Sequence, residues 1–230
     1  MIKPPALKHG ATIGIVSPSS WMDTTDLDTA KNIFENKGYN LVLGQSVFLK
    51  DDSYAGKPQQ RANDINSMFS NSDIDAIICA RGGYGANRVI PLLDYDLIRK
   101  NPKIFIGYSD ITAILISISQ QTGLITFHGP MLSSFENGDI EYNFTLMEKI
   151  TSGINNILIE SPSESLIRIL NSGKADGQLW GGNMCLLINR LGTSDQLNTD
   201  GTILFLEDIN EYLYAFDRML IHMKEAKMFQ

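Results

Sequence analysis

The fold class is decided by the stretch Ile104-Phe105-Ile106-Gly107-Tyr108-Ser109-Asp110-Ile111-Thr112. Residues 104–106 are apolar and predict a buried strand, whereas the apolar positions of residues 111–121 predict a helix. A strand therefore enters a tight turn and then a helix, with Ser109 in the turn. Units of this kind build parallel sheets, in which functional groups gather at the carboxyl ends of the strands. We expect Ser109 to lie at that edge of a sheet.

The same alternation of strand and helix continues on both sides of this stretch. Thr24 or Thr25 is expected to cap a helix that stops near Gly38, and another helix is expected to follow Pro58. Because the strands lack a clean alternation of apolar and polar residues, both faces of the sheet should be covered. The sequence predicts an α/β protein with a flavodoxin-like, doubly wound and mostly parallel sheet. The predicted strands are 12–17, 41–43, 75–80, 104–106 and 124–127.

A second, smaller α/β domain is expected after the middle of the chain. Polar segments with glycine and asparagine at 136–138 and 151–156 indicate a junction, which divides the chain into residues 1–150 and 151–230. The second part contains a strong strand at 202–206. A helix follows, with an apolar stripe formed by Leu213, Phe216, Met219, Leu220 and Met223. One strong strand and one strong helix predict a truncated domain.

Composition narrows the class of function. The chain has 230 residues, a net charge of −7 and a sequence pI ≈ 4.9, which argues against a basic surface for nucleic acids. The three histidines and two cysteines match no metal-binding or disulfide spacing, so we expect no metal site. No apolar run is long enough to span a membrane, and no secretory signal is recognisable. These features predict a cytoplasmic protein.

Ser109 fits two interpretations. A serine between a strand and a helix exposes its hydroxyl beside the N–H groups of the helix N-terminus, which would stabilise an oxyanion. The G-x-S-x-G pattern of α/β-hydrolases is absent, since Ile111 occupies the second glycine position. Serine is also a preferred N-cap residue, so this segment alone leaves a purely structural role open.

Two further strand ends carry candidate functional groups. Glycines in the segment 81–85 let backbone N–H groups approach a ligand, either as oxyanion donors or as an anion-binding turn. Glu207 and Asp208 follow the strand at 202–206, where a carboxylate could orient a histidine. The same pair could instead cap the next helix.

Taken in order, these segments resemble the serine LD-carboxypeptidase family, also called muramoyl-tetrapeptide carboxypeptidases, which includes the microcin C immunity peptidases. The resemblance covers nearly the whole chain. The matching segments are Gly14-Ile15-Val16-Ser17-Pro18-Ser19, Ala80-Arg81-Gly82-Gly83-Tyr84-Gly85, Leu93-Asp94-Tyr95-Asp96, Asn101-Pro102-Lys103, Gly107-Tyr108-Ser109-Asp110-Ile111-Thr112, Phe127-His128-Gly129-Pro130-Met131, Gly181-Gly182-Asn183 and Leu206-Glu207-Asp208.

The resemblance implies a Ser-Glu-His triad that removes the terminal D-alanine from muropeptide tetrapeptides during cell-wall recycling. Ser109 matches the nucleophile and Glu207 the acid, and the oxyanion hole would use the N–H of Asp110 and one from Gly82 or Gly83. No cofactor is implied, and a homodimer is a candidate assembly.

The family histidine lies further on than residue 230, so the chain as given is expected to have little peptidase activity. Two alternatives stay open: an immunity peptidase that cleaves microcin-type peptidyl-adenylates, and a non-catalytic flavodoxin-like domain that binds a ligand.

Overall fold

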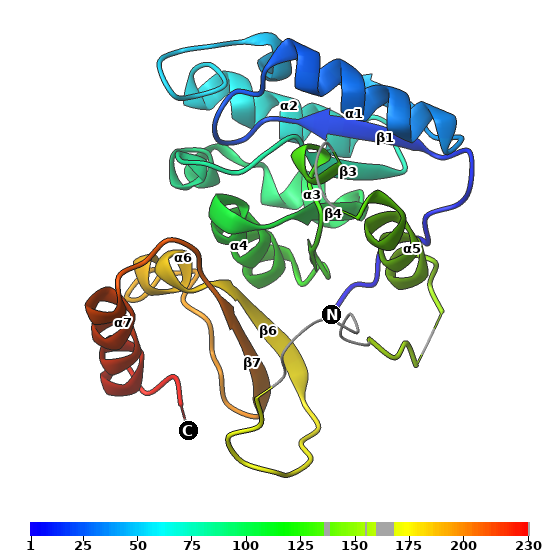
Figure 1. Cartoon of the computed structure of the whole chain (residues 1–230). Coiled ribbons are helices and arrows are strands. Elements are labelled where there is room, and N and C mark those ends of the chain that lie inside the picture. Colours follow the sequence, from blue (N-terminus) through cyan, green and yellow to red (C-terminus); the bar gives the residue numbers. More distant parts are fainter. Residues whose placement is uncertain (136–138, 155, 160–167, 230) are drawn as a thin grey trace.

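The computed structural model describes residues 1–135, 139–154, 156–159 and 168–229. The chain forms two α/β units, each with its own parallel sheet (Figure 1). The strands and α-helices, in chain order, are β1 (Thr12–Val16), α1 (Thr24–Asn36), β2 (Asn40–Leu43), α2 (Pro58–Ser70), β3 (Ala76–Cys79), α3 (Tyr95–Lys100), β4 (Ile104–Gly107), α4 (Thr112–Thr122), β5 (Phe127–His128), α5 (Ile140–Thr151), β6 (Gln178–Asn183), α6 (Met184–Asn189), β7 (Thr202–Glu207) and α7 (Leu213–Glu225).

The first sheet has five parallel strands in the order β2-β1-β3-β4-β5. The chain first moves outward from β1 to β2 and then crosses to β3 on the other side of β1. The loops that follow β1 and β3 therefore diverge, and such a switch point leaves a crevice where α/β proteins bind ligands. The predicted flavodoxin-like strand order is confirmed.

Helices cover both faces of this sheet. Successive residues of a strand point to opposite faces, so Ile77 and Phe105 pack against α2, α3 and α4, whereas Ile78 and Ile106 pack against α1 and α5. Phe144 of α5 is buried in the second of these clusters. The two faces are both apolar because both are covered, which confirms the doubly wound prediction.

Two local predictions are corrected. The N-cap of α1 is Asp23, whose carboxylate accepts a hydrogen bond from the Thr25 N–H at 3.0 Å, so neither Thr24 nor Thr25 caps this helix. The fifth strand is shorter than expected and begins at Phe127, because Leu124 forms an isolated bridge with Ile2 of the N-terminal segment.

The second unit packs β6 beside β7 in parallel, from Gln178 opposite Thr202 to Asn183 opposite Glu207. Its small core joins Met184 and Met223 to Ile116 of α4. The predicted stripe of α7 is only partly buried. Leu213 is 89% exposed and Leu220 is 42% exposed, because the described residues cover only one side of this helix. The division at residue 150 stays a prediction.

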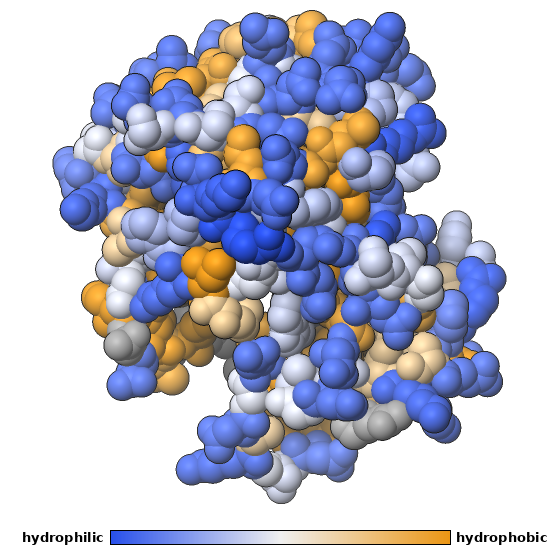
Figure 2. Space-filling view, turned by 180° about the vertical axis from the view of Figure 1, so that it is seen from behind, coloured by the Kyte–Doolittle hydropathy of each residue, from blue (hydrophilic) through white to orange (hydrophobic). Residues whose placement is uncertain are grey.

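The rear face of the molecule is mostly hydrophilic, with hydrophobic side chains gathered beside a notch in its lower part (Figure 2). Large apolar side chains of the second unit, such as Leu179, Ile203 and Tyr212, are exposed. Among the described residues, no helix is long and apolar enough to cross a membrane.

Asp195 anchors the second unit to α4. Its carboxylate accepts hydrogen bonds from the Ser117 hydroxyl at 2.8 Å, the Gln121 side-chain amide at 2.6 Å and the Arg190 guanidinium at 2.8 Å. Burial alone would raise the pKa of Asp195, but these hydrogen bonds and the charge of Arg190 lower it below its ordinary value. The ionised carboxylate therefore stabilises the contact between the units.

We expect Asp195→Asn to lower the free energy of unfolding by about 2–3 kcal/mol at pH 7, because a buried charge-assisted network is broken. Because the pKa of Asp195 is lower in the folded state than in the unfolded state, its ionised carboxylate stabilises the fold at pH values above the unfolded-state pKa of about 4. This stabilisation is lost as the pH falls through the folded-state pKa. Urea unfolding at pH 7 and at pH 3 measures both effects, and the difference from the wild type should shrink at pH 3.

The matched control is Asp96→Asn. Asp96 pairs with Arg99 at 2.6 Å, but its side chain is 77% exposed, so its removal should change the unfolding free energy by no more than about 0.5 kcal/mol. Equal effects of the two substitutions would contradict the role assigned to Asp195.

Candidate active site

Ser109 occupies a strained turn between β4 and α4. Its φ of 60° lies in the left-handed region, which is uncommon for any residue except glycine. Tyr108 before it is extended, and a 3-10 turn over Ser109–Ile111 leads into α4, which begins one residue after the start predicted from the apolar positions of residues 111–121. A strained serine between a strand and a helix is the geometry of a nucleophile elbow.

The Ser109 hydroxyl forms no hydrogen bond with any described residue, and no side chain caps this helix start. An N-cap serine would accept a hydrogen bond from an N–H of the first helical turn. The structure therefore decides against the capping interpretation. The hydroxyl is half-buried and available to a ligand.

The loop that follows β3 approaches Ser109 closely. A Cβ placed on Gly82 would lie 3.0 Å from the Ser109 Cβ and 3.1 Å from its Oγ, so a side chain here would crowd the serine. Gly83 has a φ of 118°, which also favours glycine. Within the described chain, neither Gly82 nor Gly83 donates a hydrogen bond from its N–H. These groups and the Asp110 N–H stay the predicted oxyanion donors.

The carboxylate of Asp110 joins the loops that follow β1, β3 and β4. Its Oδ2 accepts hydrogen bonds from the Ser19 hydroxyl at 2.5 Å and the Ala86 N–H at 2.8 Å. Burial raises the pKa of the Asp110 carboxyl, and these hydrogen bonds and the charge of Arg61 oppose the rise. The network fixes the glycine-rich loop beside Ser109. No local sequence pattern reveals this network, because Ser19 and Asp110 are 91 residues apart.

Arg61 of α2 donates hydrogen bonds to two of the same loops. It is 1% exposed, and its Nη1 donates hydrogen bonds to the Pro18 carbonyl at 2.5 Å and the Gly85 carbonyl at 3.2 Å. Burial lowers the pKa of the guanidinium, and the charge of Asp110 opposes this. The sequence did not single out Arg61 as a site residue. The signal that could have done so is its place directly before Ala62, an apolar position of the helix after Pro58, where a charged side chain is unexpected.

Glu207 is brought to the N-terminal end of α4 by the second sheet. The Asn183 N–H donates a hydrogen bond to the Thr112 hydroxyl at 3.1 Å, and Asn183 lies opposite Glu207 in the register of β6 and β7. Thr112 is the first residue of α4 and lies three positions after Ser109. The second unit thus carries Glu207 to the same end of α4 as Ser109. The family resemblance further predicts that the two side chains face one cleft, and this stays a prediction.

The carboxylate of Glu207 is only partly satisfied. Burial and the neighbouring charge of Asp208 raise its pKa, and the amide of Asn183 opposes the rise. Its Oε1 is buried and has no hydrogen-bond partner among the described residues. Burying a hydrogen-bond acceptor without a donor costs free energy of folding. The Oε1 of Glu207 can therefore accept a hydrogen bond from a group outside the described residues.

None of the three histidines forms a hydrogen bond with Ser109 or Glu207 in the described part of the chain. His128 is the last residue of β5, with its ring 6.0 Å from the Tyr108 ring and 5.0 Å from the Phe205 ring; the residue is exposed, although partial desolvation of the imidazole lowers its pKa. The apolar residues around His222 in the sequence predict that its side chain points into packing, and this is wrong, because His222 is exposed. Across the described residues, no group of acidic, histidine or cysteine side chains is arranged to hold a metal ion.

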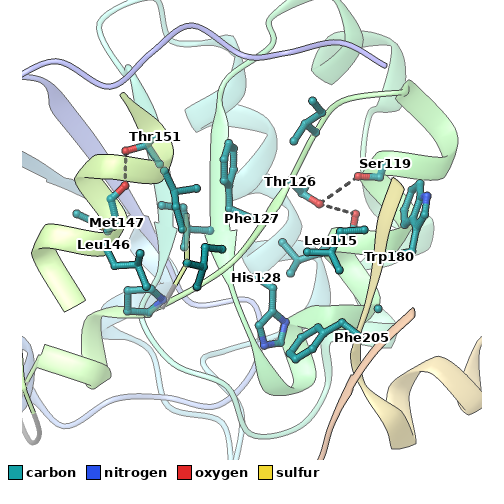
Figure 3. Close-up of a pocket in the computed structure, with 18 of the residues that line it drawn as sticks. Leu115, Ser119, Thr126, Phe127, His128, Leu146, Met147, Thr151, Trp180 and Phe205 are labelled. Atoms are coloured by element: carbon teal, nitrogen blue, oxygen red, sulfur yellow. Dashed lines mark hydrogen bonds between the residues drawn. The ribbon is translucent and has the colours of Figure 1, made fainter. Parts of the chain in front are cut away.

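A mostly apolar cavity of ≈ 340 Å³ lies beside β5, between the two units. Leu115 and Phe127 line it from the first unit, and Trp180 and Phe205 line it from the second (Figure 3). The imidazole of His128 stands at its edge, next to Phe205 (Figure 3). The cavity can bury an apolar or aromatic part of a ligand.

Comparison with known families gives matches in both units. Residues 13–129 match the LD-carboxypeptidase N-terminal domain, and residues 176–230 match the LD-carboxypeptidase C-terminal domain. The matched segments contain Ser109 and Glu207, respectively.

Individual relatives agree with this match. The chain is 40% identical to the probable murein peptide carboxypeptidase of Bacillus subtilis, over 96% of the chain and 70% of the relative. It is 34% identical to the microcin C7 self-immunity protein MccF of Escherichia coli, over 97% of the chain and 74% of the relative. The crystal structure of the MccF-like protein of Bacillus anthracis superimposes with a TM-score of 0.90 and 30% identity, over 100% of the chain and 78% of that protein. The chain belongs to the LD-carboxypeptidase family.

Proposed function

We propose that this protein provides the Ser109 nucleophile and the Glu207 acid of a serine LD-carboxypeptidase, which removes the terminal D-alanine from muropeptide tetrapeptides in the cytoplasm. The observation that carries the proposal is the left-handed turn at Ser109, whose hydroxyl is unbonded and lies against Gly82. The relative named as a probable murein peptide carboxypeptidase supports the choice of substrate.

In the proposed reaction, the Ser109 oxygen attacks the carbonyl carbon of the scissile amide while an imidazole takes the hydroxyl proton. The N–H groups of Asp110 and of Gly82 or Gly83 stabilise the oxyanion. The imidazolium then gives its proton to the amine of D-alanine as the C–N bond breaks. Water, deprotonated by the same imidazole, hydrolyses the resulting ester and frees Ser109.

The imidazole is assigned by the family resemblance to a histidine beyond residue 230. The unpartnered Oε1 of Glu207 supports this assignment, since an acid of a triad accepts a hydrogen bond from the imidazole and holds it in one orientation. The positive charge of an imidazolium would also lower the pKa of Glu207, which burial raises in the described residues.

The test is an assay of D-alanine release, by chromatography of the products, with a longer form of the chain that carries the family histidine. We expect release of a single D-alanine from the tetrapeptide muropeptide and none from a peptide that ends in L-alanine. Cleavage of both peptides, or of neither, would contradict the proposed specificity.

A second candidate is cleavage of microcin-type peptidyl-adenylates. It is favoured by the similarity to the microcin C7 self-immunity protein and by the aromatic side chains of Trp180 and Phe205 in the cavity, which suit a planar base. In the same assay, a peptidyl-adenylate analogue cleaved much faster than the muropeptide would favour this candidate.

A further inference from the structure

Arg81 lies at the switch point of the first sheet and directly precedes Gly82. Its guanidinium crosses from the loop after β3 to the loop after β1, where Nη1 donates a hydrogen bond to the Trp21 carbonyl at 3.3 Å. Gly82 is the residue whose β-position lies 3.0 Å from the Ser109 Cβ. Arg81 therefore places an exposed positive charge within one residue of the backbone that touches the nucleophile.

No carboxylate of the described residues forms an ion pair with Arg81. Arg99 and Arg190 form ion pairs with carboxylates, and Arg61 is buried beneath the loops. Among the ion pairs of the described residues, none involves Arg81, and the single hydrogen bond to Trp21 leaves its other N–H groups free. An exposed guanidinium held by one backbone carbonyl is oriented and still able to bind a ligand.

A second cation, Lys50, also contacts Trp21. The Lys50 ammonium lies 3.5 Å from the centre of the Trp21 ring and forms no ion pair among the described residues. Trp21 thus carries one cation on its backbone carbonyl and another on its indole face. Asp23 lies two residues after Trp21, and Asp51 and Asp52 follow Lys50, so the charged group offered to an anionic ligand is the guanidinium of Arg81 and not a net positive patch.

We propose that Arg81 binds the free carboxylate of the terminal residue that the enzyme removes. The inference rests on the proposed function and deepens it. In a peptide that ends in D-alanine, this carboxylate lies two bonds beyond the scissile nitrogen, so its receptor must belong to the loops around Ser109, and Arg81 directly precedes Gly82 in one of them. A guanidinium binds a carboxylate through two parallel hydrogen bonds, which fixes both its distance and its orientation.

This assignment explains why the site removes a terminal residue. A peptide that continues beyond the scissile bond presents a neutral amide in place of the carboxylate, and it would leave the guanidinium without an anionic partner. A site built for a charged group rejects the analogue that lacks it, because its own polar groups are left unpaired. Arg81 is therefore a specificity residue.

The test measures binding of two ligands to the 230-residue chain by isothermal titration calorimetry. One is the tetrapeptide muropeptide with a free terminal carboxylate, and the other is its terminal carboxamide. We expect the wild type to bind the acid about 10- to 100-fold more tightly than the amide, as a charge-assisted hydrogen-bonded pair predicts. Arg81→Met should bring this ratio close to one, and Arg81→Lys should lower it partly.

Arg88→Met is the matched control. Arg88 is an exposed arginine of the same loop region, but its guanidinium lies 5.2 Å from the Tyr54 ring, and we expect it to keep the wild-type ratio. An unchanged melting temperature shows that each variant is folded. If the wild type binds acid and amide equally, or if Arg81→Met keeps the ratio, the role of Arg81 is wrong while the proposed function stands. If the wild type binds neither ligand, the proposed substrate is wrong, and the role of Arg81 with it.

Discussion

Replacing Ser109 by alanine is expected to abolish D-alanine release in a form of the chain that carries the family histidine. Without the hydroxyl there is no acyl-enzyme, and loss of a nucleophile of this kind lowers kcat by about 10⁶-fold. The fold should stay intact. The Ser109 hydroxyl has no hydrogen bond to lose in the described residues, so the free energy of unfolding should change by no more than about 0.5 kcal/mol.

The measurement combines kcat from D-alanine release with urea unfolding of the same preparation. Ser70→Ala is a suitable control, since Ser70 is exposed at the end of α2 and bonds only to the Ser67 carbonyl. It should keep wild-type turnover. Wild-type turnover in Ser109→Ala would exclude Ser109 as the nucleophile, whatever the geometry of its turn.

We predict that the 230-residue chain releases D-alanine about 10⁶-fold more slowly than the longer form, because none of its described histidines bonds to Ser109 and could take its proton. His9 and His222 are exposed, and His128 bonds to neither Ser109 nor Glu207 within the described residues. The Oε1 of Glu207 likewise has no donor there. The two forms should be compared at equal concentration with the tetrapeptide muropeptide.

Robust release by the 230-residue chain would overturn this expectation. His128→Asn in that chain would then be the first variant to make, because His128 lies beside Gly107 at the end of β4 and is the histidine nearest the turn of Ser109 along the sheet. His222→Asn, on the exposed side of α7, serves as its control.

Much of the first sheet could be predicted from local sequence. The strand Ile104–Gly107 and the helix Thr112–Thr122 appear where the sequence predicted them, because a short apolar run before a turn is typical of a buried strand and the longer run after it is typical of a helix. The start of α1 was less certain, because several residues near a helix start can cap it. Only the backbone geometry selects Asp23 over Thr24 and Thr25.

The sequence by itself determined the doubly wound class, the order of its motifs and the position of Ser109 between a strand and a helix, since these depend on residues that are neighbours along the chain. The sequence was compatible with two roles of Ser109, as a helix cap and as a nucleophile. The tertiary structure argues against capping, because no side chain caps this helix start, and the φ of 60° with the close approach of Gly82 supports the proposed catalytic role. It also supplied the network of Asp110 with Ser19, which joins distant loops that no local pattern connects. Local periodicity encodes elements, whereas a site is made where strands that are distant in sequence end side by side.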